Sequence, residues 1–250
     1  MNLTINEFKE QFDSLTDGWS WEIQGFIDQN GVVYPIDSDT KVISTVFERL
    51  SSPVLRTIAS NNDYTVNTAN QTTYPDFTLS KQDENGAVTH RIAIDIKTTY
   101  FEERRNMVFT LGSYKSFIRN NTKNILFPYD TYHEHWVLGF IYSRNEAFEE
   151  YNLSNLPKIG QINCPYDLKE IFIRDKISIV GLRAGSGNTA NIGSVKLKNP
   201  AEFKTIEGPF KQFTHSYAAH ELYWSRYEKY SQEIHTSTDL YNHPDFINFR

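Results

Sequence analysis

Two short stretches of this sequence bring together side chains that could hydrolyse a phosphodiester bond. They are Tyr74–Asp76 and Asp95–Lys97. Successive side chains of a strand point to opposite faces, so Asp95 and Lys97, two residues apart, would lie side by side on the same face. If Asp76 lies on a neighbouring strand, a second carboxylate joins them. Two carboxylates suit Mg²⁺, which activates water and neutralises charge at phosphorus, and a lysine could position or help deprotonate that water.

The spacing alone is a weak signal, because a solvated strand edge with an ion pair would give the same pattern. Two details favour a catalytic site over a simple ion pair. Asp95 and Lys97 share a face of an otherwise apolar strand, where charges are costly unless they are paired or used. Thr98 and Thr99 follow directly and could contact a phosphate or a base. The residues by themselves leave the ion pair and the metal-assisted hydrolase both open.

The elements that must position these groups are expected to be strands. The clearest is Arg91–Lys97, in which three isoleucines occupy one face while Ala93, Asp95 and Lys97 occupy the other. Asp76–Leu79 also alternates, with Asp76 and Thr78 on one face. Other expected strands are Tyr64–Val66, Trp136–Tyr142, and a hairpin of Ile171–Ile173 with Ile177–Val180 around Arg174–Asp175.

Helical periodicity is clear in the first fifty residues. An apolar stripe at helical spacing follows a cap at Thr4 and consists of Ile5, Phe8, Phe12 and Leu15. A second helix is expected from Ser38–Asp39 to the break at Ser51–Pro53. Its inward stripe is Val42, Ile43, Val46, Phe47 and Leu50, which leaves Glu48 beside the apolar face.

The last third is less regular. The aromatic segment Tyr217–Ile234 is helical in period, whereas the residues from His235 onward show weak periodicity and are expected to be peripheral. Because helices and strands mix along the whole chain, we expect an α/β (α+β) fold.

Charge and cysteine content limit the classes of function. The net charge of −6 argues against a DNA-binding protein. The segment from Lys97 to Lys123, however, contains six basic and two acidic residues, so the protein could still present a local basic surface. Cys164 is the only cysteine, which excludes an intrachain disulfide and a cysteine-rich zinc site. With neither a signal peptide nor a membrane-spanning run in the sequence, we expect a cytoplasmic protein without membrane contact.

Five collinear motifs resemble the EcoRV family of type II restriction endonucleases, within the PD-(D/E)xK nuclease superfamily. The resemblance covers roughly residues 22 to 195 and fades in the last third. The motifs are DSDTKVISTVFE at 37–48, TYPDFTL at 73–79, IAIDIKTTY at 92–100, SFIRNNTKN at 116–124 and GSGNTANIGS at 185–194.

The resemblance implies a Mg²⁺-dependent catalytic site. Asp76 and Asp95 would be metal-binding carboxylates and Lys97 the catalytic lysine. Glu48 would be a further catalytic and metal-binding acid, and Lys41 a supporting lysine that contributes to DNA binding.

It also implies a set of DNA contacts. A recognition loop in the major groove would be formed by Gly185, Ser186, Gly187, Asn188 and Thr189. Glycines admit close backbone approach, and asparagine can bond bidentately to adenine. Groups near the backbone, the central bases and the minor groove would be Asn70, Gln71, Thr99, Ser116, Lys123 and Arg144. Thr72 and Ala190 depart from the family pattern.

For the whole molecule, the resemblance implies one restriction-endonuclease-like domain over 1–250, a central mixed β-sheet flanked by helices. Dimerisation elements would lie at about 15–65, in a U-shaped homodimer around double-stranded DNA. The expected site is the palindrome GATATC, cut bluntly at a flexible central TA step. A methyltransferase of the same system is expected as a partner, without a stable complex.

Competing interpretations of the same residues are weaker. The chain could be a catalytically inactive sequence-specific DNA-binding protein, or a structure-specific repair nuclease. Gly185–Ala190 partly fits a dinucleotide-binding fingerprint, but a poor helix start follows it. His133–His135 is better explained as a polar loop than as a metal site, Cys164 as an ordinary small residue, and the aromatic run Tyr217–Tyr230 as helix packing.

Overall fold

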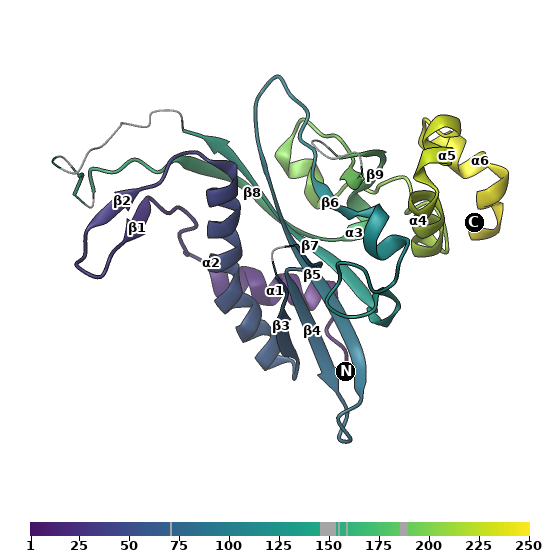
Figure 1. Ribbon diagram of the computed structural model, residues 1–250, viewed down its shortest axis with the longest axis horizontal. Coiled ribbons are helices and arrows are strands. Elements are labelled where there is room, and N and C mark those ends of the chain that lie inside the picture. The colour runs from purple at the N-terminus through teal and green to yellow at the C-terminus, as the bar shows by residue number, and fades with distance from the viewer. Residues whose placement is uncertain (71, 146–153, 155, 159, 186–189) are drawn as a thin grey trace.

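The computed structural model describes residues 1–70, 72–145, 154, 156–158, 160–185 and 190–250. Within these residues a five-stranded sheet has the order β3-β4-β5-β7-β8, and a three-stranded sheet has the order β6-β10-β9. In the larger sheet β5 and β7 are parallel and the other pairs are antiparallel. Helices flank this mixed sheet, so the expected α+β architecture is confirmed (Figure 1).

The strands of the larger sheet include every one that the sequence indicated near the chemical cluster. They are β3 (Thr65–Thr68), β4 (Phe77–Gln82), β5 (Val88–Tyr100), β7 (Glu134–Arg144) and β8 (Tyr166–Asp175). The smaller sheet contains β6 (Thr110–Ser113), β9 (Val180–Ala184) and β10 (Asn191–Ser194). A separate two-stranded hairpin consists of β1 (Gly25–Ile27) and β2 (Val33–Pro35).

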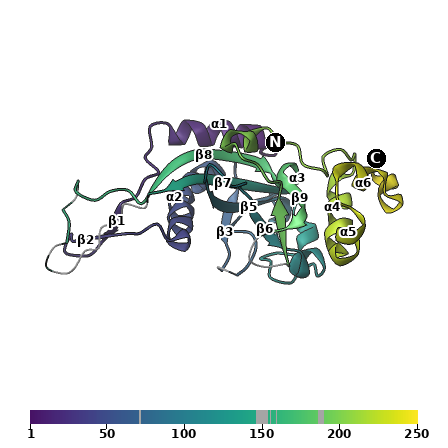
Figure 2. The same ribbon diagram turned by 90° about the horizontal axis from the view of Figure 1, so that it is seen from above.

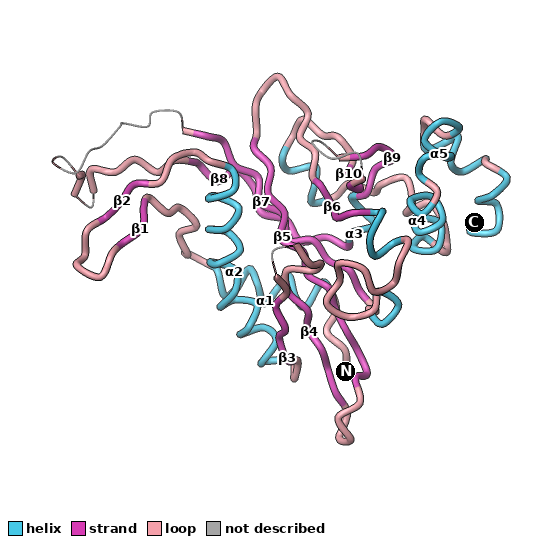
Figure 3. The backbone as a smooth tube through the Cα atoms, in the orientation of Figure 1, coloured by secondary structure: helices cyan, strands magenta, loops and turns pink. Residues whose placement is uncertain are grey.

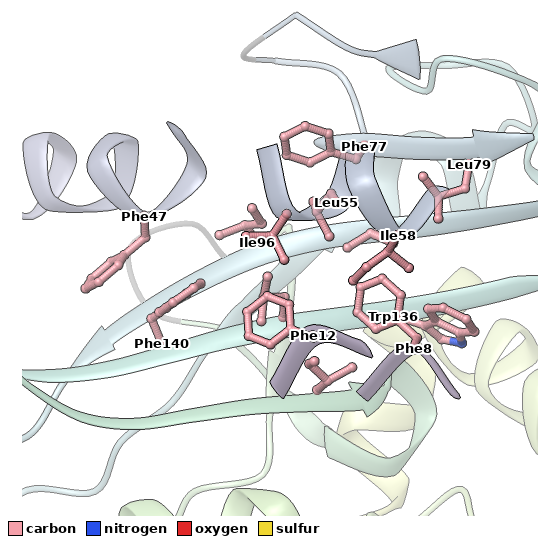
Figure 4. Packing of buried hydrophobic residues seen from close by; sticks show 14 of the residues in the cluster. Phe8, Phe12, Phe47, Leu55, Ile58, Phe77, Leu79, Ile96, Trp136 and Phe140 are labelled. Atoms are coloured by element: carbon pink, nitrogen blue, oxygen red, sulfur yellow. The ribbon is translucent and has the colours of Figure 1, made fainter. Parts of the chain in front are cut away.

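Two helices cover one face of the larger sheet. In α1 (Ile5–Thr16), Thr4 forms the expected cap as part of a capping box with Glu7. Together with α2 (Thr40–Asn61) it encloses the isoleucine face of β5. Figure 4 shows Phe47 of α2 against Phe140 of β7, with ring centroids 4.4 Å apart, and Figure 2 shows α1 lying along the sheet.

The expected end of the second helix at Ser51–Pro53 is wrong, because α2 continues through Pro53 to Asn61. Beyond the proline the helix buries Val54, Leu55 and Ile58. Each buried aliphatic side chain is worth about 1.5–3 kcal/mol, so the set outweighs the roughly 3 kcal/mol that an interior proline costs.

The expected hairpin around Arg174–Asp175 is also wrong. Residues 171–173 lie in β8, which pairs with β7, whereas Lys176–Ile179 form the short helix α3. Val180 then begins β9, which pairs with β10. The two halves of the supposed hairpin therefore belong to different sheets, and their partners come from distant parts of the chain.

The C-terminal region packs firmly, contrary to the expectation that it is peripheral. The aromatic segment forms α4 (Ser216–Ser225) and α5 (Tyr227–Glu233), and α6 (Ser237–Asn242) follows. Leu240 and Phe246 are fully buried in the core cluster that also contains Tyr223 and Trp224. Shorter helical turns are found at η1 (Tyr114–Ile118), η2 (Tyr129–Thr131), η3 (Pro200–Lys204) and η4 (Pro244–Phe249).

The elements give an elongated molecule. The β1–β2 hairpin projects at one end, and α4, α5 and α6 gather at the other, with the larger sheet between them (Figures 1 and 3). None of the helices in the described ranges is long and apolar enough to cross a lipid bilayer.

Candidate active site

Asp95 and Lys97 lie next to each other on one face of β5, as strand alternation predicted. The Lys97 Nζ is 2.8 Å from the Asp95 Oδ2. Below them, Ile92, Ile94 and Ile96 are buried against the helices. β4 pairs with the first half of the strand, up to Ile94, and β7 pairs with the second half, which contains Asp95 and Lys97.

Asp76 joins the pair from the neighbouring strand. It directly precedes β4, where Phe77 is in register with Ile94 of β5. The Asp76 Oδ2 accepts a hydrogen bond of 2.6 Å from the Ile96 amide and lies 3.9 Å from the Lys97 Nζ. Two carboxylates and one ammonium are therefore brought together, as the sequence predicted.

Burial and charge act in opposite directions on this cluster. Desolvation raises the pKa of Asp76 to about 7, with a further rise from Asp95 and an opposing effect from Lys97. Desolvation would lower the pKa of Lys97, but the attraction of Asp95 and Asp76 outweighs it, so the pKa is raised. Lys97 is therefore charged at neutral pH, which suits it to positioning a nucleophile and stabilising anionic charge.

The donor set fits a small divalent cation. The Lys97–Asp95 contact has the distance of an ion pair but not the direction of a hydrogen bond, so the buried Asp95 Oδ2 has no hydrogen-bond partner among the described residues. Carboxylate oxygens are the ligands that Mg²⁺ prefers. In the described part of the chain, no three His, Cys, Asp or Glu side chains group closely enough to hold a metal. Water or phosphate would therefore complete the coordination.

A cavity of about 210 Å³ opens at these three side chains. The predicted Ser116 lines it, and its hydroxyl donates to the Ser113 carbonyl at 3.0 Å. Polar lining residues that sequence reasoning missed as site residues are Thr72, Thr73, Ser113, Asn124 and Asn191. Asn124 lies inside a recognised motif, but single polar residues in loops give no sequence signal of their own.

A second cavity of about 340 Å³ lies beside the first and also includes Lys97. The predicted Thr99 lines it and donates to the Val108 carbonyl at 3.3 Å. Thr98 is paired with Ser44 of α2. Lys97 therefore stands where two polar cavities meet.

Glu48 and Lys41 lie on α2, away from the closest contacts of the cluster. Glu48 is partly buried, and its charge helps to raise the pKa of Lys97, so it lies within electrostatic reach. Lys41 is exposed and lines an apolar groove along α2. The structure thus relates Glu48 to the cluster and places Lys41 on another surface of the helix.

The remaining predicted DNA contacts are distributed over loops and strand ends. Asn70, Lys123 and Arg144 are exposed, and the Arg144 guanidinium lies 4.0 Å from the centre of the Tyr100 ring. The Gly185 amide donates to the Asn191 carbonyl at 2.9 Å. A Cβ at Gly185 would lie 3.0 Å from the Thr110 hydroxyl, so the backbone at Gly185 passes close to the Thr110 side chain. Outside the described residues are Gln71, Ser186, Gly187, Asn188 and Thr189.

Comparison with known proteins agrees with this geometry. The family model described as "Restriction endonuclease EcoRV" matches residues 17–250. The chain is 42% identical over 230 residues to a type II restriction enzyme, EcoRV, of Escherichia coli. That alignment covers 89% of this chain and 87% of the relative.

Proposed function

This chain belongs to the EcoRV family of restriction endonucleases, which are site-specific deoxyribonucleases, and from this premise we propose that it is a Mg²⁺-dependent enzyme cutting both strands of a short palindrome. The single observation that carries the proposal is the convergence of Asp76, Asp95 and Lys97 at one cavity. An inactive DNA-binding protein would have no need to concentrate these charges.

Asp76 and Asp95 would hold Mg²⁺, with Glu48 as a third acid at longer range. The ion would supply charge neutralisation at the phosphate and a lower pKa for a bound water. Lys97, which keeps its proton, would orient the attacking water and stabilise the negative charge that develops on the phosphate oxygens. The Ile96 amide fixes the Asp76 carboxylate, so its orientation is set before DNA arrives.

We propose the target GATATC, cut bluntly. Support comes from the motif at 185–194, in which Gly185, Ser186, Gly187, Asn188 and Thr189 would read base edges in the major groove. Asn70 and Gln71 would lie at the minor groove, and Thr99, Ser116, Lys123 and Arg144 near backbone and central bases. The central TA step would be read by its ease of bending.

We further propose a homodimer in which a second copy covers the N-terminal apolar surface. Phe26 and Ile27 of the hairpin are 54% and 68% exposed. Beside Phe26 lies a groove of about 400 Å³, lined also by Val42, Val46 and Leu50 of α2. An exposed apolar patch of this kind indicates an interaction surface. It falls within the dimerisation elements expected at about 15–65, and a two-fold dimer matches a palindrome with one cluster for each strand.

A cytoplasmic location follows from this proposal, because the enzyme must meet invading DNA there. A methyltransferase with the same specificity would protect the host DNA without forming a stable complex with this chain.

The test is digestion of plasmid DNA with and without Mg²⁺, followed by sequencing of the ends. Blunt ends within GATATC support the proposal, and discrete ends in another sequence would correct the target alone. The Asp95→Ala variant should bind the cognate duplex but cleave it at least a thousandfold more slowly, an estimate from the loss of metal-assisted catalysis. Binding without any cleavage by the wild type would instead support an inactive DNA-binding protein.

A further inference from the structure

A second lysine, Lys176, is buried near the active site and is not used by the mechanism above. It is the first residue of α3 and only 2% exposed. Its Nζ has no hydrogen-bond partner among the residues that the structure describes. A buried ammonium without such a partner carries a large desolvation cost. A charged side chain in such a place requires another source of stabilisation than a hydrogen bond.

Two aromatic rings form a cradle for this ammonium. The Lys176 Nζ lies 4.6 Å from the centre of the Tyr74 ring and 5.1 Å from that of Phe117. The two rings stack on each other with centroids 4.4 Å apart. Aromatic faces attract cations, and the attraction is strongest where water is excluded. A Cβ at Gly112 would lie 2.8 Å from the Phe117 ring and 3.9 Å from the Nζ, so a larger residue would disturb the cradle.

The cradle is continuous with the active-site cavity. Tyr74, Phe117 and Gly112 all line that cavity, and Tyr74 is two residues before Asp76. The hydroxyl of Tyr74 is also fixed, because it is bonded to the His135 Nδ1 at 2.8 Å. A change in the cradle is therefore transmitted to the backbone that presents Asp76.

Lys176 also interacts with the cluster through its charge. Burial lowers its pKa to about 8, while Asp95 attracts the charge and Lys97 repels it. Two buried histidines, His135 and His220, have lowered pKa values through burial and through the field of Lys176. Both histidines are therefore neutral, and Lys176 is the cation that opposes their protonation.

We propose that Lys176 is a positioning residue for this active site, a buried cation that orients Asp76 through Tyr74 and weakens the hold of the carboxylate pair on a divalent cation. When both carboxylates are ionised, the charges of Lys97 and Lys176 balance those of Asp76 and Asp95 before any metal binds. An added divalent cation then leaves the site with a net positive charge, which weakens metal binding in the absence of DNA. The inference rests on the proposed function, because it takes Asp76 and Asp95 as metal ligands.

The first test measures Mn²⁺ binding to the DNA-free protein from the electron paramagnetic resonance signal of free Mn²⁺. Lys176→Met keeps a long apolar side chain and removes the charge. At an effective dielectric constant of about 20, losing a positive charge within about 20 Å of the bound ion should tighten Mn²⁺ binding by at least about tenfold. The matched control, Lys198→Met, removes an exposed lysine charge and should leave the affinity unchanged. Equal affinity in wild type and Lys176→Met would overturn the inference.

The second test separates this inference from the proposed function. Asp95→Asn should abolish Mn²⁺ binding, and retained binding would overturn the proposed metal site and the claim about affinity together. Lost binding in Asp95→Asn with unchanged binding in Lys176→Met would overturn the role of Lys176 alone.

A third measurement reports on the charge itself, independently of metal. In Lys176→Met the pKa values of His135 and His220 should rise, which proton NMR titration detects, and unchanged values would contradict a charged Lys176. If the variant does not fold, the charge of Lys176 can be tested in ¹³C-labelled wild-type protein instead. Mg²⁺ should shift the ε-carbon signal of Lys176 in the wild type but not in Asp95→Asn, and an unmoved signal would count against the inference.

Discussion

At the scale of single residues, Asp76 and Asp95 share one lysine but have different surroundings. The Asp95 side chain is 4% exposed and lies 2.8 Å from the Lys97 Nζ, whereas Asp76 is 29% exposed, lies 3.9 Å away and is fixed by the Ile96 amide. Both carboxylates line the cavity, but Asp95 is the more buried of the two and Asp76 the more exposed. Lys97 compensates for both, so its removal affects charge balance as well as catalysis.

Lys97→Met should reduce the rate of cleavage by about 10²–10³-fold, because the developing charge on the phosphate loses its ammonium donor. Single-turnover cleavage of a cognate duplex at saturating enzyme measures the chemical step. Lys169→Met, a change at an exposed lysine of β8, is the matched control and should cut at the wild-type rate. A Lys97→Met enzyme of full activity would exclude this lysine from the chemistry.

The pH dependence of stability provides a separate prediction for Asp76. Its pKa is raised in the folded protein from 3.8 to about 7, so between these values the folded state holds a proton that the unfolded state has released. The stability contributed by this group is therefore complete below the unfolded pKa, declines as pH rises, and is lost above about pH 7. Asp76→Asn removes this dependence.

Urea unfolding in EDTA at several pH values measures the effect. The free energy of unfolding of Asp76→Asn relative to wild type should increase from pH 4 to pH 7 and then level off. A difference independent of pH would show that Asp76 titrates normally in the folded protein.

At the scale of elements, β5 and α2 position the residues of the proposed active site. β5 presents Asp95 and Lys97 on one face and buries its isoleucines on the other, against α2. α2 carries Glu48 in its first half and pairs with β5 through Ser44 and Thr98. Its course past Pro53 shows that apolar burial, rather than the local helix signal, decides where it ends.

Pro53→Ala tests that balance. Position 53 is exposed inside the helix, where alanine is favoured over proline by about 3 kcal/mol. The greater flexibility that alanine gives the unfolded chain offsets about 0.4–1 kcal/mol of this gain, so we expect the free energy of unfolding to rise by about 2–2.5 kcal/mol. Arg56→Ala, at another exposed position of α2, should change it by less than about 0.5 kcal/mol. A loss of stability in Pro53→Ala would mean that the proline fits a local bend of the helix.

At the scale of the whole molecule, the apolar hairpin and the packed C-terminal helices lie at opposite ends of the chain's long axis (Figure 1). The catalytic cluster lies on the sheet between them. The proposed dimer surface on the hairpin is therefore distant from the C-terminal helices, which pack in a core that they share with strands of both sheets.

Phe26→Asp should therefore produce monomers in analytical ultracentrifugation, because a charge in the centre of an apolar interface is costly. Cleavage of both strands should be lost with it. Val88→Asp introduces the same charge at another exposed apolar position, at the start of β5, and should leave the association state unchanged. A Phe26→Asp protein that remains dimeric would exclude this face as the interface.

Features that depend on neighbours along the chain were predictable from the amino-acid sequence. The alternation of Arg91–Lys97 placed Asp95 and Lys97 on one face, and Thr4 was the expected cap of the first helix. These features were predictable because they involve residues two to four positions apart. The family motifs added Glu48 and narrowed a possible metal-assisted hydrolase to a sequence-specific DNA endonuclease.

The pairing of distant segments was visible only in the folded protein. The tertiary structure extended α2 beyond Pro53, assigned residues 171–173 and 180–184 to different sheets, and buried Leu240 and Phe246. It also placed the Lys176 Nζ against the stacked rings of Tyr74 and Phe117, which lie far from it in the sequence. The physical reason is the same in each case. Burial and strand pairing depend on contacts between segments that are distant in the chain. Together these contacts outweigh the tendency of a proline to end a helix, of a polar pair to form a turn, and of a lysine to stay in water.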